Sequence, residues 1–250
     1  MSHHSIEATG LSFVYPDGTR ALDDVSFRLG HGESVAIVGA NGAGKSTLLL
    51  QLTGFLRPTG GQVRIGEVPI TRETLADIRK AIGVVFQDPD DQLFMPTVYE
   101  DVAFGPVNHR LPAEEVASRV TEALARVGAT HLADRPPYRL SGGEKRAVAI
   151  ASALALCPNI LIMDEPSSNL DPKARRRLIE LLAGFEHTKV VATHDLDLAL
   201  ELCERTIVMS AGTVTADGPT RAIFGNDALL EASGLEKPLG MQGCPLCGGE

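Results

Sequence analysis

The chain has 250 residues, of which 44% are hydrophobic and 22% are charged, and its formal net charge is −9. This composition is typical of a soluble globular protein, and the length suits one α/β domain. No apolar run reaches the roughly 18–20 residues of a membrane-spanning helix, and no signal-peptide pattern opens the chain. We therefore expect that the protein does not itself cross a membrane. The negative charge argues against nucleic acid as a partner.

The first 30 residues and Gln62–Ile65 are typical of short β segments joined by turns, which predicts a small antiparallel β layer. Apolar runs then alternate with helical patterns, and this alternation indicates a parallel sheet with helices on both faces. The predicted strands are Ser34–Val38, Ile82–Phe86, Ile160–Met163, Lys189–Ala192 and Thr206–Met209, and the predicted helices are Lys45–Leu52, Ala113–Val127, Gly142–Leu156, Pro172–Phe185 and Leu196–Glu204.

Residues 95–140 carry no strand signal, so we expect a helical lobe at about residues 95–155, inserted within one domain over residues 1–235. The Gly- and Pro-rich residues 236–250 predict a flexible tail.

The segment Gly39–Thr47 follows a predicted strand and opens a predicted helix, which is the context of a phosphate-binding loop. Its glycines let backbone N–H groups surround the phosphates, and the helix start adds its positive end. We predict that Lys45 binds the β- and γ-phosphates and that the Ser46 hydroxyl binds Mg²⁺. The predicted nucleotide-binding residues of this loop are Gly39, Asn41, Gly42, Ala43, Gly44, Lys45, Ser46 and Thr47.

Two carboxylates end the apolar run that begins at Ile160. We predict that Asp164 faces the Mg²⁺ ion and that Glu165 acts as the general base on an attacking water. The alternative is that this pair only precedes a capped helix at Pro166 and Ser167.

The segment Ser141–Gly143 opens another helix, where a hydroxyl and unencumbered N–H groups form a second anion site without a lysine of its own. A site of this kind needs a partner that supplies the rest of the nucleotide. Ser141 also fits an N-cap with Glu144 closing a capping box, and we expect both descriptions to hold together.

With these three motifs in this order, residues 5–225 resemble the ATP-binding-cassette ATPases. The resemblance implies a P-loop ATPase core with an antiparallel β layer and a helical subdomain, which hydrolyses Mg²⁺-bound ATP. It also implies a head-to-tail dimer, most simply a homodimer, in which Ser141, Gly142, Gly143 and Glu144 contact the ATP held by the opposing subunit. In the family's pattern His194 contacts the γ-phosphate and orients the general base and water. Ser168 and Asp171 match the segment that touches the neighbouring subunit, and Tyr15 matches an aromatic residue that stacks on adenine.

Gln87 ends a predicted strand, where its amide could meet Mg²⁺ or the attacking water. The runs Asp88–Phe94 and Pro96–Gly105 after it are similar to those of energy-coupling-factor transporter ATPases, in which this region contacts a membrane subunit. The whole chain is most similar to cobalt and nickel uptake ATPases. This implies a peripheral protein at the cytoplasmic face of the membrane, with the cargo held by other subunits. The alternative for Asp90, Asp91 and Gln92 is that they only cap and solvate a surface helix.

Two further alternatives stay open: a soluble ATPase of the same fold acting on DNA, the ribosome or iron–sulfur assembly, and the ATPase of a vitamin importer.

The chain ends carry residues of metal-ligand types, namely His3, His4, Cys244 and Cys247. A functionally silent tail is the simpler interpretation, because one Cys-x-x-Cys supplies only half of the ligands of a zinc site.

Three remaining predictions are structural. Cys157 and Cys203 are expected to be core thiols. The basic run Lys173–Arg177 is expected to be a solvated helix face.

Overall fold

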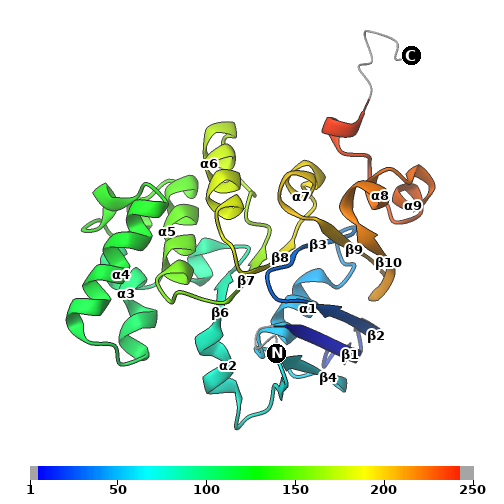
Figure 1. Cartoon of the computed structure of the whole chain (residues 1–250), viewed down its shortest axis with the longest axis horizontal. Helices are drawn as coiled ribbons and strands as arrows, with labels where there is room; N and C mark the ends of the chain where they lie inside the picture. The colour runs from blue at the N-terminus through cyan, green and yellow to red at the C-terminus, as the bar shows by residue number, and fades with distance from the viewer. Residues whose placement is uncertain (1–4, 243–250) are drawn as a thin grey trace.

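The computed structural model describes residues 5–242, and its strands form two sheets (Figure 1). A four-stranded antiparallel sheet has the order β2-β1-β4-β5, and a six-stranded sheet has the order β10-β9-β3-β8-β7-β6. The strands are β1 (Ile6–Val14), β2 (Arg20–Leu29), β3 (Ser34–Val38), β4 (Gly60–Ile65), β5 (Val68–Pro69), β6 (Ile82–Val85), β7 (Ile160–Asp164), β8 (Thr188–Ala192), β9 (Arg205–Ser210) and β10 (Thr213–Pro219). The predicted antiparallel layer and the five predicted core strands are confirmed.

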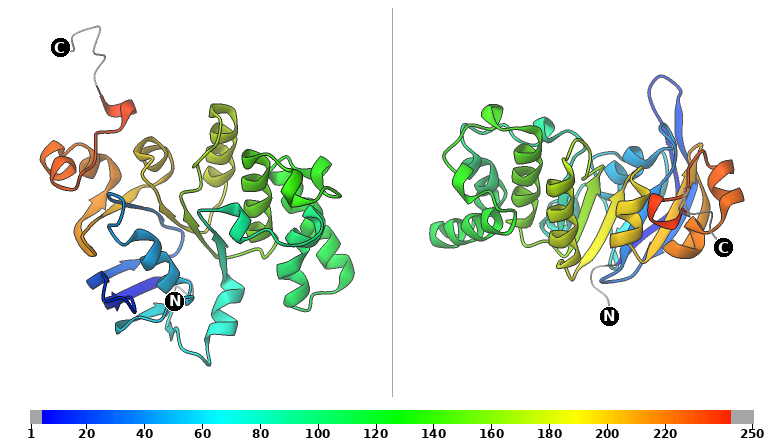
Figure 2. Two further views of the ribbon diagram at one scale, coloured as in Figure 1. Left: turned by 180° about the vertical axis from the view of Figure 1, so that it is seen from behind. Right: turned by 90° about the horizontal axis from the view of Figure 1, so that it is seen from above.

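Helices cover the larger sheet, and the predicted helices are confirmed to within a few residues at their ends. The helices are α1 (Lys45–Leu52), α2 (Leu75–Ala81), α3 (Val98–Asn108), α4 (Ala113–Arg126), α5 (Gly142–Leu154), α6 (Pro172–Ala183), α7 (Leu196–Leu202), α8 (Thr220–Phe224) and α9 (Asp227–Ala232). Helices α3, α4 and α5 gather into a lobe at one end of the molecule, and Figure 2 shows the same separation from behind and from above. This is the segment in which we expected helices and no strand.

The alternation of side chains along each central strand divides the core between the two faces of the larger sheet. In β3, Val35 and Ile37 join the cluster shared with α1 and the antiparallel layer, whereas Ala36 and Val38 join the cluster under α3–α9. Both faces of the larger sheet are therefore buried at these strands, which explains why their sequences are continuously apolar.

Elements that the sequence did not reveal lie at the edges of the fold. β10 pairs antiparallel with β9, so the larger sheet is mixed rather than wholly parallel. Its residues alternate between half-buried and exposed, and it ends in Gly-Pro, which gives no apolar run. The helices α2, α8 and α9 have only five to seven residues each, too short for a clear periodic signal.

The first part of the expected tail makes specific contacts. The N–H groups of Leu239 and Gly240 donate to the carboxylate of Asp197 at 3.1 and 2.8 Å, and Lys237 pairs with Asp227. The two metal-ligand pairs at the chain ends, His3 with His4 and Cys244 with Cys247, lie outside the described residues.

Across residues 5–242, no helix combines the length and the apolar character needed to cross a bilayer. Cys203 is buried, as expected, but the prediction for Cys157 is wrong, because this residue is exposed. It has a φ of +51° in the turn before Pro158, just past the end of α5.

Candidate functional site

The parallel strands β3, β8, β7 and β6 are neighbours, so the loops that leave their carboxyl ends meet at one edge of the sheet. The phosphate loop follows β3, the Asp164–Glu165 pair lies at the end of β7, His194 follows β8 and Gln87 follows β6. The topology therefore brings together residues that lie up to 155 positions apart in the sequence.

The phosphate loop wraps around the side chain of Lys45. The Lys45 ammonium is buried and donates to the carbonyls of Gly39 and Ala40 at 2.8 and 3.1 Å, so the loop's own backbone holds this charge in place. Gly44 has a φ of +101°, and a Cβ at this position would lie 2.5 Å from the carbonyl oxygen of Ala21. Only glycine fits there. Asn41, Gly42 and Ser46 are exposed on the open side of the loop.

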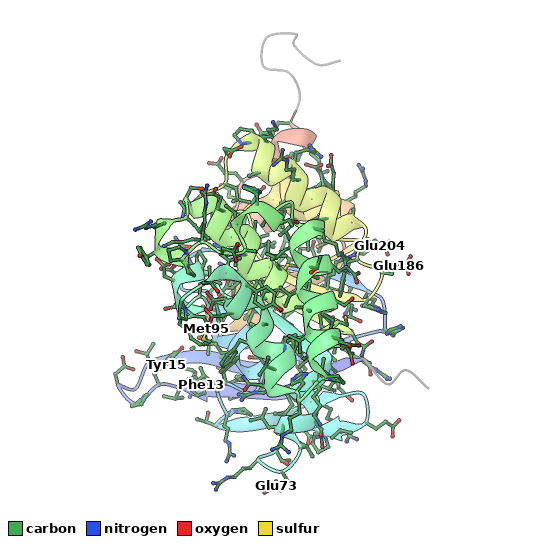
Figure 3. All side chains as sticks on the ribbon, turned by 90° about the vertical axis from the view of Figure 1, so that its left-hand side faces the viewer. Phe13, Tyr15, Glu73, Met95, Glu186 and Glu204 are labelled. Atoms are coloured by element: carbon green, nitrogen blue, oxygen red, sulfur yellow. The ribbon has the colours of Figure 1, made fainter. Side chains whose placement is uncertain are left out.

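Tyr15 directly follows β1, and its side chain reaches α1, the helix that the phosphate loop opens. Its hydroxyl is 3.0 Å from the Thr47 hydroxyl, and its ring packs edge-to-face on that of Phe13, with 4.9 Å between the ring centroids. Figure 3 shows Tyr15 and Phe13 near each other along the antiparallel layer. The half-buried ring is therefore oriented by two contacts beside the phosphate loop, in a place consistent with the predicted adenine contact.

Asp164 has the features expected of a ligand for a hard cation. Its Oδ1 atom is buried and has no hydrogen-bond partner among the described residues. Burial raises the pKa of Asp164, whereas a hydrogen bond with the Ser46 side chain acts in the opposite direction. An unsatisfied carboxylate oxygen beside a hydroxyl suits Mg²⁺, which prefers oxygen ligands. The residues present thus fit the predicted ion.

Glu165 is held by the loop that follows β8. Its φ is +47°, a strained conformation for this residue type, and its N–H donates to Ala192 at 2.8 Å. The carboxylate accepts from the Thr193 hydroxyl at 3.1 Å and from the His194 N–H at 3.1 Å, and it lies 2.8 Å from His194 Nδ1. The base candidate and the predicted histidine are therefore in direct contact. The Glu165 side chain is almost fully buried, whereas the imidazole is largely exposed.

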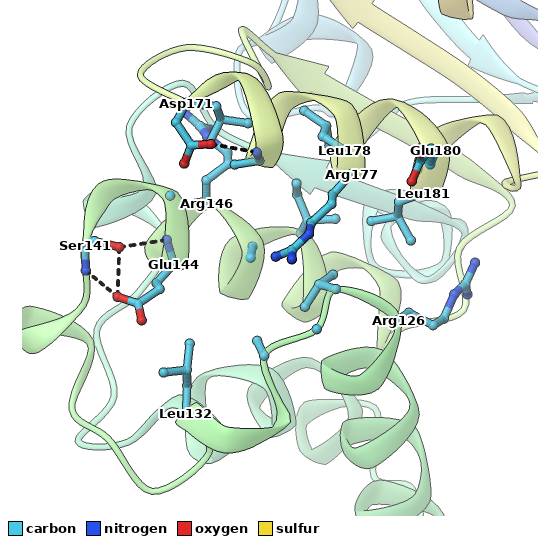
Figure 4. Close-up of a pocket in the computed structure, with 18 of the residues that line it drawn as sticks. Arg126, Leu132, Ser141, Glu144, Arg146, Asp171, Arg177, Leu178, Glu180 and Leu181 are labelled. Atoms are coloured by element: carbon cyan, nitrogen blue, oxygen red, sulfur yellow. Dashed lines mark hydrogen bonds between the residues drawn. The ribbon is translucent and has the colours of Figure 1, made fainter.

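Ser141–Glu144 lies on the helical lobe rather than beside the phosphate loop (Figure 1). The capping box is confirmed: the Ser141 hydroxyl accepts from the Glu144 N–H at 3.3 Å, and Glu144 accepts from the Ser141 N–H at 2.8 Å. Figure 4 shows this cap beside the start of α6, where the Asp171 carboxylate accepts from the N–H groups of Lys173 and Ala174. The half-buried Ser168 lies in the turn that leads to Asp171.

Gln87 is exposed, and its loop is fastened to α5 by Arg146, which the sequence analysis did not single out, and by Gln92, whose role it did not predict. Arg146 is 2% exposed and donates to the carbonyls of Phe86 and Gln87 at 2.6 and 2.5 Å. Gln92 accepts from the Phe86 N–H at 3.2 Å and donates to the Ala149 carbonyl at 2.7 Å. The interpretation of Gln92 as a surface solvating residue is therefore wrong.

The interpretation of the adjacent acidic residues fits better. Asp90 is an exposed partner of Lys145, and Asp88, rather than Asp90 or Asp91, caps the short turn after the strand.

The comparisons with known proteins agree with this arrangement. The family described as "ABC transporter" matches residues 22–168. A Geobacter sulfurreducens protein provisionally named as an ABC transporter ATP-binding protein is 62% identical and covers 99% of this chain and 100% of its own. An energy-coupling factor transporter ATP-binding protein of Carboxydothermus hydrogenoformans is 46% identical, over 94% of this chain and 88% of its own.

Solved structures give the same result. The structure of cbiO1 from Clostridium perfringens, described as part of the complex cbiONQ, has a TM-score of 0.80 and 39% identity, covering 92% of this chain and 94% of its own. A dimeric cassette in a post-hydrolysis state bound to ADP and Pi has a TM-score of 0.79 and 32% identity, covering 86% and 99%. The chain therefore belongs to the ABC transporter family, as an ATP-binding subunit that hydrolyses ATP.

Proposed function

We propose that this protein is the ATPase of an energy-coupling-factor importer for cobalt or nickel, bound peripherally to the cytoplasmic face of the membrane. Two copies sandwich two ATP molecules, and closing and reopening of this dimer drives an integral membrane subunit. Other subunits hold the cargo. The observation that carries the coupling role is an exposed apolar patch beside the Gln87 loop.

The chemistry is in-line attack of water on the γ-phosphorus of ATP, which breaks its bond to the bridging oxygen and releases ADP. Lys45 and the loop N–H groups hold the phosphates, and Glu165 accepts the proton that the water loses. Asp164, Ser46 and Gln87 would hold Mg²⁺, which neutralises phosphate charge when bound. His194 orients Glu165 through the contact of 2.8 Å described above.

Residues of the opposing subunit complete each site. The capped start of α5, at Ser141–Glu144, contacts the γ-phosphate held by the other copy, and Ser168 and Asp171 lie in the contact between copies. Support comes from the two capped helix starts: the Ser141 cap fixes the start of α5 beside the exposed backbone of Gly142, and the Asp171 cap fixes the start of α6 at the surface.

The patch consists of Phe94, Phe104 and Val107, residues that are 61%, 43% and 56% exposed. The rings of Phe94 and Phe104 stack edge-to-face at 4.9 Å. Asp101 fixes the loop beneath them, since its buried carboxylate accepts from the N–H groups of Phe94 and Met95. An exposed apolar patch of this kind fits a protein-binding surface. We assign it to a cytoplasmic helix of the membrane subunit.

The cargo proposal rests on the whole-chain resemblance to cobalt and nickel uptake ATPases, and the similarity to cbiO1 supports it. A deletion strain tests this step: we expect cobalt and nickel uptake to fall while vitamin uptake is unchanged. Normal metal uptake with failed vitamin import would instead identify a vitamin importer.

The coupling role is tested by gentle purification from native membranes and mass spectrometry of the proteins that accompany the chain. We expect an integral membrane subunit, and its loss in a Phe94→Ser, Phe104→Ser variant. Ribosomal, DNA-bound or cluster-assembly partners without a membrane subunit would favour a soluble ATPase.

The catalytic role has its own test. Glu165→Gln should bind ATP and dimerise but turn over about 10²–10⁴ times more slowly, because the base is lost while the phosphate loop is intact. Glu180→Gln, an equal charge change on the exposed face of α6, is the matched control. Hydrolysis by Glu165→Gln at the parent rate would show that Glu165 is not the base.

A further inference from the structure

Arg175 does not belong to a solvated helix face, contrary to the prediction for its basic run. Its side chain is only 25% exposed and forms a two-bond contact with Asp195: Nε to Oδ2 at 2.8 Å and Nη2 to Oδ1 at 3.0 Å. Glu201 lies 3.5 Å from the third guanidinium nitrogen. A guanidinium held by two parallel bonds has a fixed orientation, which a lysine could not reproduce.

Asp195 receives hydrogen bonds from two further segments. It accepts from the Ser167 hydroxyl at 3.1 Å and, as the N-cap of α7, from the Leu198 N–H at 2.9 Å. Burial raises the pKa of Asp195, but the bonds from Arg175 and Leu198 outweigh this effect, so its pKa lies below the usual value. The carboxylate is thus an ionised centre to which α6, α7 and the turn after Glu165 are fastened.

A continuous path of hydrogen bonds leads from this centre to the base. The Asp195 N–H donates to the Thr193 hydroxyl at 3.0 Å, and this hydroxyl donates to the Glu165 carboxylate at 3.1 Å. At its other end the path begins on α6, four residues after the Asp171 cap. It therefore connects the predicted surface of subunit contact with the predicted base through side chains that are at least partly buried.

We infer that Arg175 is a positioning residue, which transmits the approach of the opposing subunit at Ser168–Asp171 to the loop that carries His194 and to Glu165. The inference rests on the proposed function, since it takes Glu165 as the base and Ser168–Asp171 as a contact between copies. Among the described residues, the Arg175 side chain contacts Asp195 and Glu201, which belong neither to the phosphate loop nor to the predicted nucleotide contacts. Its loss should therefore act on turnover rather than on ATP affinity.

The test compares Arg175→Met and Arg175→Lys with Arg176→Met in the full-length protein. Arg176 is the matched control because it lies next along α6, is 55% exposed and, in the part of the chain that the structure describes, pairs with Glu201 alone. For Arg175→Met we expect kcat to fall about 10–100-fold, because a small misplacement of a catalytic group has an effect of this order. The Kd for ATP should change less than about twofold. If the hydrolysis rate of the parent rises sigmoidally with ATP concentration, that of the variant should rise hyperbolically.

Arg175→Lys should recover only part of kcat, since it restores the charge without the two-bond geometry, and Arg176→Met should match the parent. An unchanged kcat in folded Arg175→Met would overturn the inference, and so would equal losses in ATP affinity and kcat. If Arg175→Met does not fold, Asp195→Asn gives the same comparison from the other partner, and a parent-like kcat there overturns the inference as well.

Measuring Glu165→Gln alongside distinguishes failure of the proposed function from failure of the positioning role of Arg175. If that variant hydrolyses ATP at the parent rate, the assignment of the base fails whatever Arg175 does. If it is inactive and Arg175→Met is fully active, only the positioning role fails.

Discussion

Arg146 offers a quantitative test of how the Gln87 loop is held. Its guanidinium is the donor to the carbonyls of Phe86 and Gln87, so Arg146→Met leaves two acceptors without these bonds. Each lost partner costs about 1–3 kcal/mol when the remaining group is buried. Phe86 is half-buried and Gln87 is exposed to water, so we place the total at the low end, about 2–4 kcal/mol.

For a domain of this size, a change of 1 kcal/mol shifts Tm by about 2–4 °C, so Arg146→Met should melt about 4–16 °C below the parent. Circular dichroism during heating measures this shift, and urea unfolding checks the free energy. Lys145→Met is the control: Lys145 is the neighbouring residue and pairs with the exposed Asp90, a contact worth at most about 1 kcal/mol. Equal melting temperatures for the two variants would refute the reasoning.

Three further predictions concern the loop, the metal and a buried thiol. Gly44→Ala should bind a fluorescent ATP analogue at least about tenfold more weakly, since its Cβ would meet the Ala21 carbonyl; parent-like affinity would show that the loop can shift. Asp164→Asn should bind ATP normally without Mg²⁺ but lose the gain in affinity that Mg²⁺ gives, which calorimetry with and without the ion measures. Burial raises the pKa of Cys203 to about 11, above the value of 9.0 for an unperturbed thiol. The protonated thiol is therefore favoured by folding, so its contribution to stability is complete below pH 9 and is lost as pH rises to 11. Urea unfolding at pH 8 and pH 10.5 should show a smaller decrease for Cys203→Ala than for the parent.

The sequence was sufficient for the loop and the central strands because each of these features is local. A phosphate loop is defined by nine consecutive residues, and a strand buried on both faces is recognisable from its own apolar run. The contact between Glu165 and His194 was placed through the resemblance, because nothing near either residue indicates the other.

The residues that hold the loops of the site through hydrogen bonds were not predicted, for a physical reason. Arg146 and Gln92 act on residues of another segment, and a hydrogen bond between distant segments leaves no periodic signal. One signal was available for Arg146: helical spacing puts it on the same face as Ala149 and Ile150, where an arginine needs a buried partner. Arg175 lies in a basic run whose other members are exposed, so its neighbours concealed its role.

The order of strands in the larger sheet has a consequence for synthesis of the chain. Within residues 5–242, β3, which leads into the phosphate loop, pairs with β8 and β9 and with no other strand, and Ser34 lies opposite Lys189 in the β3–β8 pair. During translation about 150 further residues must be synthesised after β3 before either neighbouring strand can pair with it. The nascent chain therefore cannot assemble a nucleotide site until β8 is made, and ATP in the cell stabilises only molecules whose synthesis has passed this strand. A ribosome stalled before β8 should display a chain that nucleotide does not protect from protease.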